Sequence, residues 1–581
     1  MQVYRDQACS ACPNDILPQL LELTDTASSV DQCRDLLIAI GEFEAGVTDA
    51  LCPTRDSTSP LIVRLREATL AGGLLFLAAR DGDSQAQAAA RASLYVTWSR
   101  LAKFEFPLSI RVRPPEGFSQ YCLFPEQYLR AARVFQGCFR AERALVVGLR
   151  SIGTTLSAVV EASLRSSGVV TESVTLRPHG HPFDRKLEVC SELEARLAGF
   201  ARTGGWVLVV DEGPGLSGSS LTCVVDYFQR LGARPDRVVL LPAYDSSGDQ
   251  FVNERARELW RTSQRIVSHF DAGWFHDSAA RLVEEPNTAW RATSSFDWAV
   301  HPHHGRRRYR TKDPDPSAPS TVWRFAGFGR YGQAVFARAS ALAEAGFSPG
   351  ARQLKAGFMQ LDWVPNLPAN PSARSPATLS ASTVSSLRPS IGWLADYFAF
   401  RERRFRTEAP PPIEPLLQVL MTNARACLGE QATAALRVLE RELPKADRHT
   451  VVCDARPFPQ DFLSSGARSW KVDAWDHGDD HFFPGPVDIA WDLAAASEEL
   501  ELGAAGQAYL VDRYALATRD ASVVHVLPWY RATYLSFRAG YCRLAADSLA
   551  DETERARFER AFARYRDKLA RALAVSSQCV A

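Results

Sequence analysis

The sequence predicts a multidomain α/β protein, and three observations support this. The chain has 581 residues, several times the length of a usual domain core. Short apolar runs alternate with longer helix-forming stretches between residues 109 and 244, which is typical of a parallel sheet flanked by helices. A second mixed region begins near Val322 and ends in a largely helical stretch. We therefore expect an N-terminal helical region, a parallel-sheet domain and a C-terminal α+β domain.

Composition and periodicity suggest where these parts begin and end. Apolar residues recur at helical spacing from Ile16 to Phe104. Segments rich in Pro, Ser, Asp or Ala interrupt the chain at 313–320, 366–390 and 409–415. The predicted parts are a helical region (1–108), a parallel-sheet domain (109–265), a basic linker region (266–320), a small lobe (321–365) and a helical lobe (366–581).

The charge balance excludes some classes of partner. Lys+Arg and Asp+Glu both number 67, so there is no global electrostatic argument for nucleic-acid binding. The basic run 306–312 is interpreted as a solvated face. The most apolar segment, Leu70–Ala79, is far shorter than the about 20 residues that cross a bilayer. Because a secretory signal is also missing, we expect a soluble, cytoplasmic protein with small-molecule substrates and no membrane contact. The oligomeric state is left open.

The strongest local motif is an apolar strand that ends in two acids. Trp206–Val210 is followed by Asp211 and Glu212, then by a loop of small residues and a helix that begins near Ser219. Small residues let backbone N–H groups approach a phosphate, and the helix directs its positive end at the anion. The carboxylates repel phosphate but suit vicinal sugar hydroxyls or Mg²⁺. The motif therefore predicts a site for a phosphorylated sugar, with phosphate-binding candidates Leu216, Ser217, Gly218, Ser219 and Ser220.

This motif resembles the phosphoribosyl-diphosphate signature of the type I phosphoribosyltransferases. Asp211 and Glu212 match the acids that hold the ribose, and 216–220 stands at the phosphate loop. The spacer 213–215 is one residue longer than usual, and Leu216 replaces a hydroxyl residue. The resemblance implies phosphoribosyl diphosphate as donor, Mg²⁺ as cofactor and an unidentified small acceptor. It also implies an acceptor hood near 114–135, whose aromatic residues could stack on a base or belong to the core: Phe118, Tyr121, Phe124 and Tyr128.

Two further segments follow the order of that family. In the strand–turn–helix pattern 144–156, four residues resemble the diphosphate loop: Gly148, Arg150, Ser151 and Gly153. Segment 176–186 falls where the family has its mobile catalytic loop. That loop supplies cations to the departing diphosphate, and the candidates here are Arg177, Arg185 and Lys186. The alternative interpretation of this segment is a basic surface hairpin.

A second candidate site lies near the C-terminus, where acid-rich turns follow apolar strands. Asp454, Asp473 and the Asp492-Leu-Ala run resemble the aminoglycoside-phosphotransferase branch of the protein-kinase-like fold. The resemblance assigns Asp454 the catalytic role, Asp473 a metal and Asp492 a structural role, and it implies ATP and Mg²⁺. Arg324 stands on the strand where the family has a nucleotide-binding Lys. The usual His before Asp454 and the metal-binding Asn are also missing, so kinase fold is indicated more strongly than kinase activity.

A rival interpretation of this segment is a metal cluster. In it His477, Asp479, Asp480 and His481 supply carboxylate and imidazole ligands to a divalent ion, or else form a solvated acidic loop. With the carboxylates that precede them, the metal-ligand candidates are Asp473, Asp476, His477 and His481. Three functions therefore stay open. The first is a phosphoribosyltransferase with a kinase-like module, active or not. The second is a non-catalytic sensor of phosphoribosyl diphosphate or nucleotide on a pseudokinase scaffold, and the third is a metal-dependent hydrolase.

Overall fold

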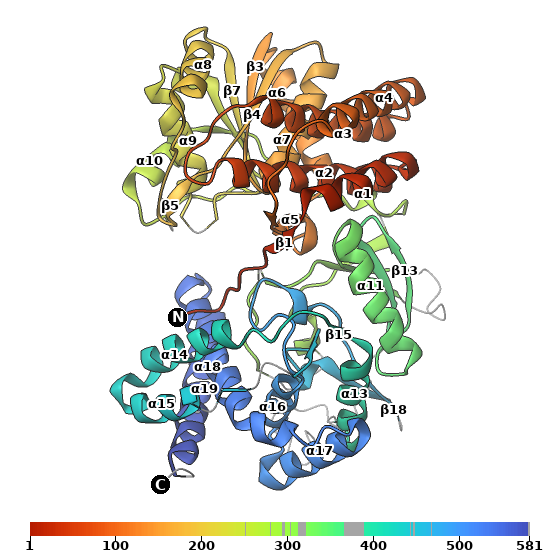
Figure 1. The fold of residues 1–581 in the computed structure, drawn as a ribbon, viewed down its shortest axis with the longest axis vertical. Coiled ribbons are helices and arrows are strands. Elements are labelled where there is room, and N and C mark those ends of the chain that lie inside the picture. Colours follow the sequence, from red (N-terminus) through yellow and green to blue (C-terminus); the bar gives the residue numbers. More distant parts are fainter. Residues whose placement is uncertain are drawn as a thin grey trace.

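The chain folds into two halves that lie one above the other (Figure 1). The upper half holds a parallel sheet wrapped by helices, and the lower half is mainly helical, with a second sheet beside it. The expected multidomain α/β fold with a parallel sheet is confirmed. The computed structural model describes residues 1–215, 217–249, 251–278, 281–292, 297–302, 304–311, 321–364, 389–441, 443–444, 448–465 and 468–578.

Five parallel strands form the upper sheet, in the order β4-β3-β7-β8-β9. The strand order reverses between β3 and β7, the first and third strands along the chain. Ligand clefts in open α/β sheets form beyond the carboxyl ends of the strands at such a switch point. The strands are β3 (Arg143–Leu149), β4 (Val170–Leu176), β7 (Trp206–Val210), β8 (Val238–Leu241) and β9 (Gln264–Arg265).

Alternate residues of these strands belong to two different cores, one on each face of the sheet. Val146 and Leu208 pack in one core, while Val147 and Val209 pack in the other. This follows from the two-residue period of a strand. The first face is covered by α6 (Pro125–Phe139) and α7 (Ile152–Ser166), and the second by α8 (Ser191–Arg202), α9 (Ser219–Arg230) and α10 (Glu254–Thr262).

The N-terminal helices share the core of the first face. Leu37 of α2 and Phe76 of α3 are fully buried in the same cluster as Val146 of the sheet. Helix α2 begins with a capping box between Ser29 and Gln32, which satisfies free N–H groups of its first turn. The helices are α1 (Pro13–Thr26), α2 (Val30–Leu51), α3 (Pro60–Asp81) and α4 (Ser84–Leu101).

A five-stranded antiparallel sheet lies between the two halves, and α11 (Gly329–Glu344) links β12 to β13 (Figure 1). Two of its strands come from the segment 266–320, which the sequence predicted as a basic linker. The basic residues there form an inner strand rather than a solvated run. In spatial order the strands are β10 (Leu282–Glu284), β11 (Arg308–Thr311), β12 (Thr321–Phe325), β14 (Phe358–Asp362) and β13 (Ala351–Lys355).

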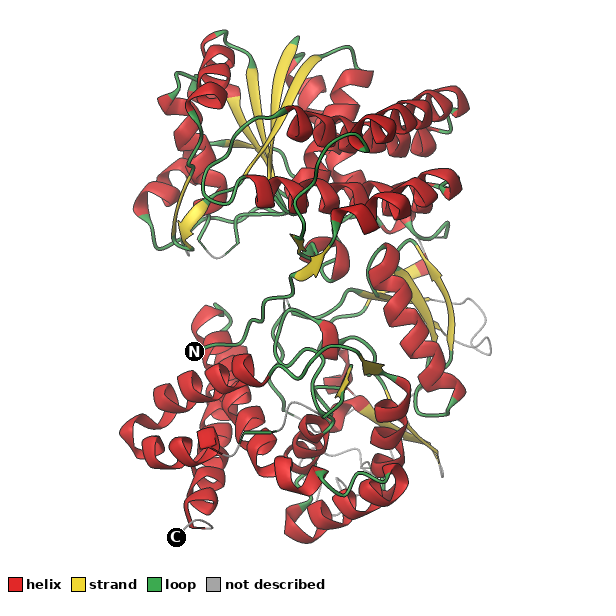
Figure 2. Cartoon of the chain, in the orientation of Figure 1, coloured by secondary structure: helices red, strands yellow, loops and turns green. Residues whose placement is uncertain are grey.

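The lower half is a helical lobe with a core of its own (Figure 2). Its helices are α13 (Ile391–Arg404), α14 (Ile413–Leu428), α15 (Thr433–Arg441), α16 (Ala490–Glu499), α17 (Gly503–Thr518), α18 (Val523–Ser548) and α19 (Glu552–Gln578). Short strand pairs complete the chain: β1 (Cys9–Ala11) with β2 (Ile110–Val112), β5 (His179–His181) with β6 (Asp184–Lys186), β15 (Arg406–Thr407) with β16 (Thr450–Val451), and β17 (Phe462–Ser465) with β18 (Arg468–Lys471).

The first residues of the chain belong to this lower half. The N–H of Gln2 donates to Oδ1 of Asn423 at 2.6 Å, and the N–H of Phe483 donates to the carbonyl of Val3 at 2.9 Å. Val3 is buried in the lower core. The chain therefore crosses from the lower half to the upper half and back, which ties the two together. Among the residues that the structure describes, no helix is both long and apolar enough to span a membrane.

Candidate functional site

A cavity of about 590 Å³ lies between the antiparallel sheet and the helical lobe. Arg308 and Arg324 line it from the sheet, and residues around β17 and β18 line it from the lobe. The upper half contributes Gln120 and Tyr121, which follow α5 (Glu116–Ser119). Its size suits a nucleotide or a similar small molecule.

The loop after β16 is fixed by Asp492 at the start of α16. Its two carboxylate oxygens accept the backbone N–H groups of Asp454 and Ala455, each at 2.8 Å. Asp492 is fully buried, so these bonds form in a medium that strengthens them. Asp492 therefore holds the loop in place, which is the structural role that its motif predicted.

Asp454 itself does not reach the cavity. Its side chain is 0% exposed, Tyr397 donates to its Oδ2 at 2.7 Å, and the Lys471 ammonium lies 3.4 Å from its Oδ1. Asp461, seven residues further along, lines the cavity instead. Burial raises the pKa of Asp461 to about 6. This arrangement corrects the expectation that Asp454 is the catalytic carboxylate, because a carboxylate sealed from the cavity cannot take a proton from a substrate bound there.

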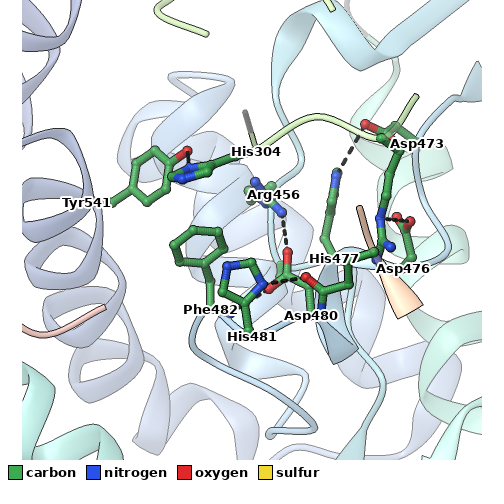
Figure 3. Close-up of polar contacts among 12 residues, drawn as sticks. His304, Arg456, Asp473, Asp476, His477, Asp480, His481, Phe482 and Tyr541 are labelled. Atoms are coloured by element: carbon green, nitrogen blue, oxygen red, sulfur yellow. Dashed lines mark hydrogen bonds and ion pairs between the residues drawn. The ribbon is translucent and has the colours of Figure 1, made fainter. Parts of the chain in front are cut away.

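Three of the predicted metal ligands do meet, since donor atoms of Asp473, Asp476 and His477 lie within 4.8 Å of one another. Figure 3 shows the His477 ring directed at Asp473, and its Nε2 lies 3.2 Å from Oδ2. The Arg324 guanidinium, however, bonds both carboxylates, at 2.8 Å to Asp476, and Arg306 adds a contact at 3.0 Å. Although burial alone would raise it, the pKa of Asp473 is held well below its usual range by Arg324 and His477. These carboxylates are already neutralised, so the arrangement does not fit Mg²⁺.

His481, the fourth predicted ligand, is turned away from this group. Its Nε2 lies 3.0 Å from the hydroxyl of Tyr121, and its Nδ1 bonds to Oε1 of Gln120. Because an amide oxygen only accepts, Nδ1 donates and Nε2 receives the phenol proton. Burial and nearby arginines lower the pKa of His481 to about 3, which keeps the ring neutral. The metal assignment of His481 is therefore corrected: both ring nitrogens are engaged.

The predicted sugar-phosphate motifs come together at the switch point of the parallel sheet. Gly148 lies one residue before the end of β3, and Gly153 lies in the first turn of α7 against it. A Cβ on Gly148 would lie 2.3 Å from the carbonyl oxygen of Gly153, and one on Gly153 would lie 2.6 Å from that of Val210. Only glycine allows the turn to pack this closely on the strand ends. Ser151 between them has φ 139°, a strained conformation for a residue with a side chain.

The cations predicted to receive a diphosphate are paired with other groups of the protein. Arg150 is buried and bonds Asp49 at 2.6 Å, with a second contact to Asp56. The guanidinium of Arg177 also bonds Asp49, at 3.0 Å from its Nε. The remaining two lie on the β5–β6 hairpin: Arg185 donates to the carbonyl of Gly180 at 2.8 Å, and Lys186 lies 3.8 Å from Asp184.

The hydroxyls of the phosphate loop are engaged as well. Ser217 and Ser219 donate to the carbonyl oxygen of Pro182 at 2.8 and 2.7 Å. A Cβ on Gly218 would lie 2.2 Å from the ring of Phe251, so that ring packs directly on the turn. Ser220 is partly buried in the first turn of α9, and Leu216 lies outside the described residues. The turn is thus covered by the hairpin and by an aromatic ring.

The two acids of the motif differ from the cations and hydroxyls around them, which are already bonded. Neither Asp211 nor Glu212 forms an ion pair with any residue that the structure describes, and both are partly buried. Burial raises the pKa of Asp211 to about 7 and that of Glu212 to about 8. The charge of Arg177 and a backbone hydrogen bond from Gly117 only partly offset this burial. That the pair holds a divalent cation or vicinal hydroxyls stays a prediction, and the adjacent phosphate turn is closed.

Three residues at the lower cavity were not foreseen as functional: Asp461 and Arg308 line it, and Lys471 contacts Asp461. Lys471 was visible as a lysine within the short strand that precedes Asp473, and Asp461 as an acid between two apolar segments. Arg308 was assigned to the basic run and given no partner. The available signal was the position of Lys471 between Trp470 and Val472, since a lysine is seldom buried unless its charge is paired.

No protein-family model and no curated protein matches this chain. Among solved structures, a choline/ethanolamine kinase family protein from Mesorhizobium loti is 18% identical, with a TM-score of 0.32 over 47% of this chain and 90% of its own. A Plasmodium vivax ethanolamine kinase is 8% identical, with a TM-score of 0.32 over 55% and 90%. Macrolide 2′-phosphotransferase type I is 16% identical, with a TM-score of 0.29 over 46% and 87%. These likenesses are distant, and the function is therefore argued from the geometry of the cavity.

Proposed function

We propose that the C-terminal half is a kinase-like small-molecule phosphotransferase module that binds a nucleotide or another phosphate ester. The observation that carries this proposal is the cavity of about 590 Å³, which guanidinium groups line from the sheet and Asp461 and Asp473 line from the lobe. Guanidinium groups bind phosphate, and a carboxylate with a pKa near neutrality can accept the proton of a hydroxyl. The cavity therefore offers a group for each reactant of a phosphoryl transfer.

In the proposed reaction, a hydroxyl oxygen of the acceptor attacks the terminal phosphorus of the donor. The bond from that phosphorus to the leaving phosphate oxygen breaks, and the hydroxyl proton passes to Asp461. Arg308 and Arg324 offset the charge on the transferring group. Asp461 suits this role because it lines the cavity and its pKa of about 6 lies close to neutrality.

The test is calorimetry of the full chain with ATP, followed by a screen of hydroxylated small molecules for transfer of labelled terminal phosphate. We expect ATP to bind and Asp461→Asn to abolish transfer while binding persists. The matched control is Asp512→Asn, an exposed carboxylate on α17 outside the cavity. Binding without transfer to any acceptor supports the sensor alternative, and failure of ATP and other phosphate esters to bind contradicts the proposal.

A second candidate is binding of phosphoribosyl diphosphate at the upper site, favoured by the uncompensated pair Asp211 and Glu212. The closed turn at Ser217 and Ser219 weighs against it, and the β5–β6 hairpin would have to move before a phosphate could enter. Release of diphosphate from this donor, lost in Asp211→Asn, tests the activity. The hydrolase alternative is disfavoured, because His481 and the carboxylates near it are already bonded.

A further inference from the structure

A buried lysine neutralises two carboxylates on the lobe side of the cavity. Lys471, on β18, is 0% exposed, and its ammonium lies 3.4 Å from Asp454 and 3.5 Å from Asp461. Burial alone would lower the pKa of Lys471, but the charges of Asp454 and Asp461 hold it above its usual range. The ammonium therefore stays charged between two carboxylates, a position that a divalent ion would otherwise suit.

The second pair of carboxylates is neutralised in the same way. Arg324 reaches from β12 to both Asp473 and Asp476, and Arg306 lies 3.0 Å from Asp476. Asp476 is 0% exposed and Arg324 only 6% exposed, so their pair is shielded from water, while Asp473 is 28% exposed. A divalent ion would have to displace a guanidinium from this buried network, which leaves a buried charge without a partner.

Arg308 differs from these cations. It lines the cavity from β11, donates to Oδ1 of Asn287 at 3.0 Å and forms no ion pair with a described residue. Its Nε is buried and has no hydrogen-bond partner among the described residues. Burial lowers the pKa of Arg308 and Arg324 adds repulsion, while the charges of Asp473, Asp461 and Glu285 offset this only in part. An anion in the cavity would relieve both costs, because a guanidinium remains protonated in proteins and binds phosphate through two parallel hydrogen bonds.

We propose that the cavity binds its phosphate-bearing ligand directly through Arg308, and that no divalent cation is needed because Lys471 and Arg324 already neutralise the carboxylates. This inference rests on the proposed function and adds the ion requirement and the anchoring residue. It accounts for four paired carboxylates in and behind the cavity wall, and for the guanidinium groups of Arg308 and Arg538, which line the cavity without an ion pair among the described residues.

The first experiment measures ATP binding to the full chain by calorimetry, once in EDTA and once in excess Mg²⁺. We expect dissociation constants within about threefold of each other and a loss of about tenfold or more in Arg308→Gln, since a charge-assisted pair is lost. Arg513→Gln, an exposed arginine on α17, is the matched control. Binding that appears only with Mg²⁺ overturns this inference but leaves the proposed function standing. The absence of binding in both buffers overturns the two together.

A second experiment tests Lys471 without relying on a nucleotide. In an Asp211→Asn/Glu212→Gln background, which silences the acid pair of the upper half, Mn²⁺ binding is followed by electron paramagnetic resonance. We expect no bound Mn²⁺ with Lys471 in place and one bound ion in Lys471→Met, where Asp454 and Asp461 lose their counter-ion. Mn²⁺ bound in the presence of Lys471 contradicts the proposal. If Lys471→Met does not fold, the EDTA comparison and Arg308→Gln still decide it.

Discussion

Tyr121 of the upper half and His481 of the lower half are joined by a hydrogen bond of 3.0 Å, with their rings edge to face. Tyr121 belongs to the segment that the sequence predicted as an acceptor hood, but its hydroxyl points into the lower cavity. Burial, together with the charges of Glu116 and Glu212, raises the pKa of Tyr121, and the charge of Asp480 acts on it as well. The Tyr121 hydroxyl is therefore influenced by charges of both candidate sites. The upper half also supplies part of the wall of the lower cavity.

Removal of this hydroxyl in Tyr121→Phe should weaken the contact between the halves. His481 would keep its bond to Gln120 but leave Nε2 without a donor, at a cost of about 1 kcal/mol in the free energy of unfolding. The measurement is thermal denaturation of Tyr121→Phe, His481→Ala and the double variant. A coupling energy clearly above zero is expected from this cycle.

Tyr509→Phe is the control for that cycle, because Tyr509 is an exposed tyrosine 52% accessible to solvent. It should leave the midpoint unchanged. Strict additivity of Tyr121→Phe and His481→Ala would show that the bond contributes nothing to the free energy of unfolding. Tyr121 would then not couple the cavity to the upper half.

Asp492→Ala should destabilise the lower half more than any surface change. The substitution leaves the N–H groups of Asp454 and Ala455 buried without an acceptor, and it removes the charge that faces Arg401. The expected loss is about 3 kcal/mol or more, seen as a lower thermal midpoint by circular dichroism. Asp396→Ala, an exposed carboxylate on α13, should change it little. Equal midpoints in the two variants would contradict the role given to Asp492.

Phosphoryl transfer, once an acceptor is found, should depend on pH through Asp461. Its carboxylate accepts the hydroxyl proton only when ionised, so the rate should rise as pH increases through about 6, where its pKa lies. The measurement is the pH profile of kcat for the unmodified chain, with ATP binding followed over the same range. A rate that stays flat from pH 5 to pH 8 would sink the assignment of Asp461 as base.

The sequence predicted the parallel sheet well because its signals are local. Its inner strands β3, β7 and β8 are short apolar runs between turn residues, and the acid pair Asp211–Glu212 directly follows β7. The antiparallel sheet was predicted only in part, because β10 and β11 are short and β11 is rich in arginine. From the sequence, its basic residues were interpreted as a solvated face. In the structure they face a cavity and pair with carboxylates of other segments.

The state of each site residue could not be read from the sequence, because it depends on partners distant in the chain. Arg150 is neutralised by Asp49 and Asp56, about a hundred positions earlier, and these acids carried no motif. His481 is bonded by residues of the opposite half. Motif spacing identifies which side chains meet locally, whereas charge compensation is decided by tertiary contacts.

The uncompensated acids of the upper half make a prediction about stability and pH. The folded-state pKa values of Asp211 and Glu212, about 7 and about 8, lie above the ordinary values of 3.8 and 4.5. Between these limits the folded protein keeps protons that the unfolded chain has released, so stability should fall as pH rises from about 4 to about 8. Asp211→Asn should remove part of this slope and stabilise the protein at pH 8 by about 1–2 kcal/mol. The measurement is the thermal midpoint at each pH, with the exposed Glu22→Gln as control. A slope in Asp211→Asn as steep as in the unmodified chain would show that a cation already compensates the pair, and that the site is not free for a sugar or a metal ion.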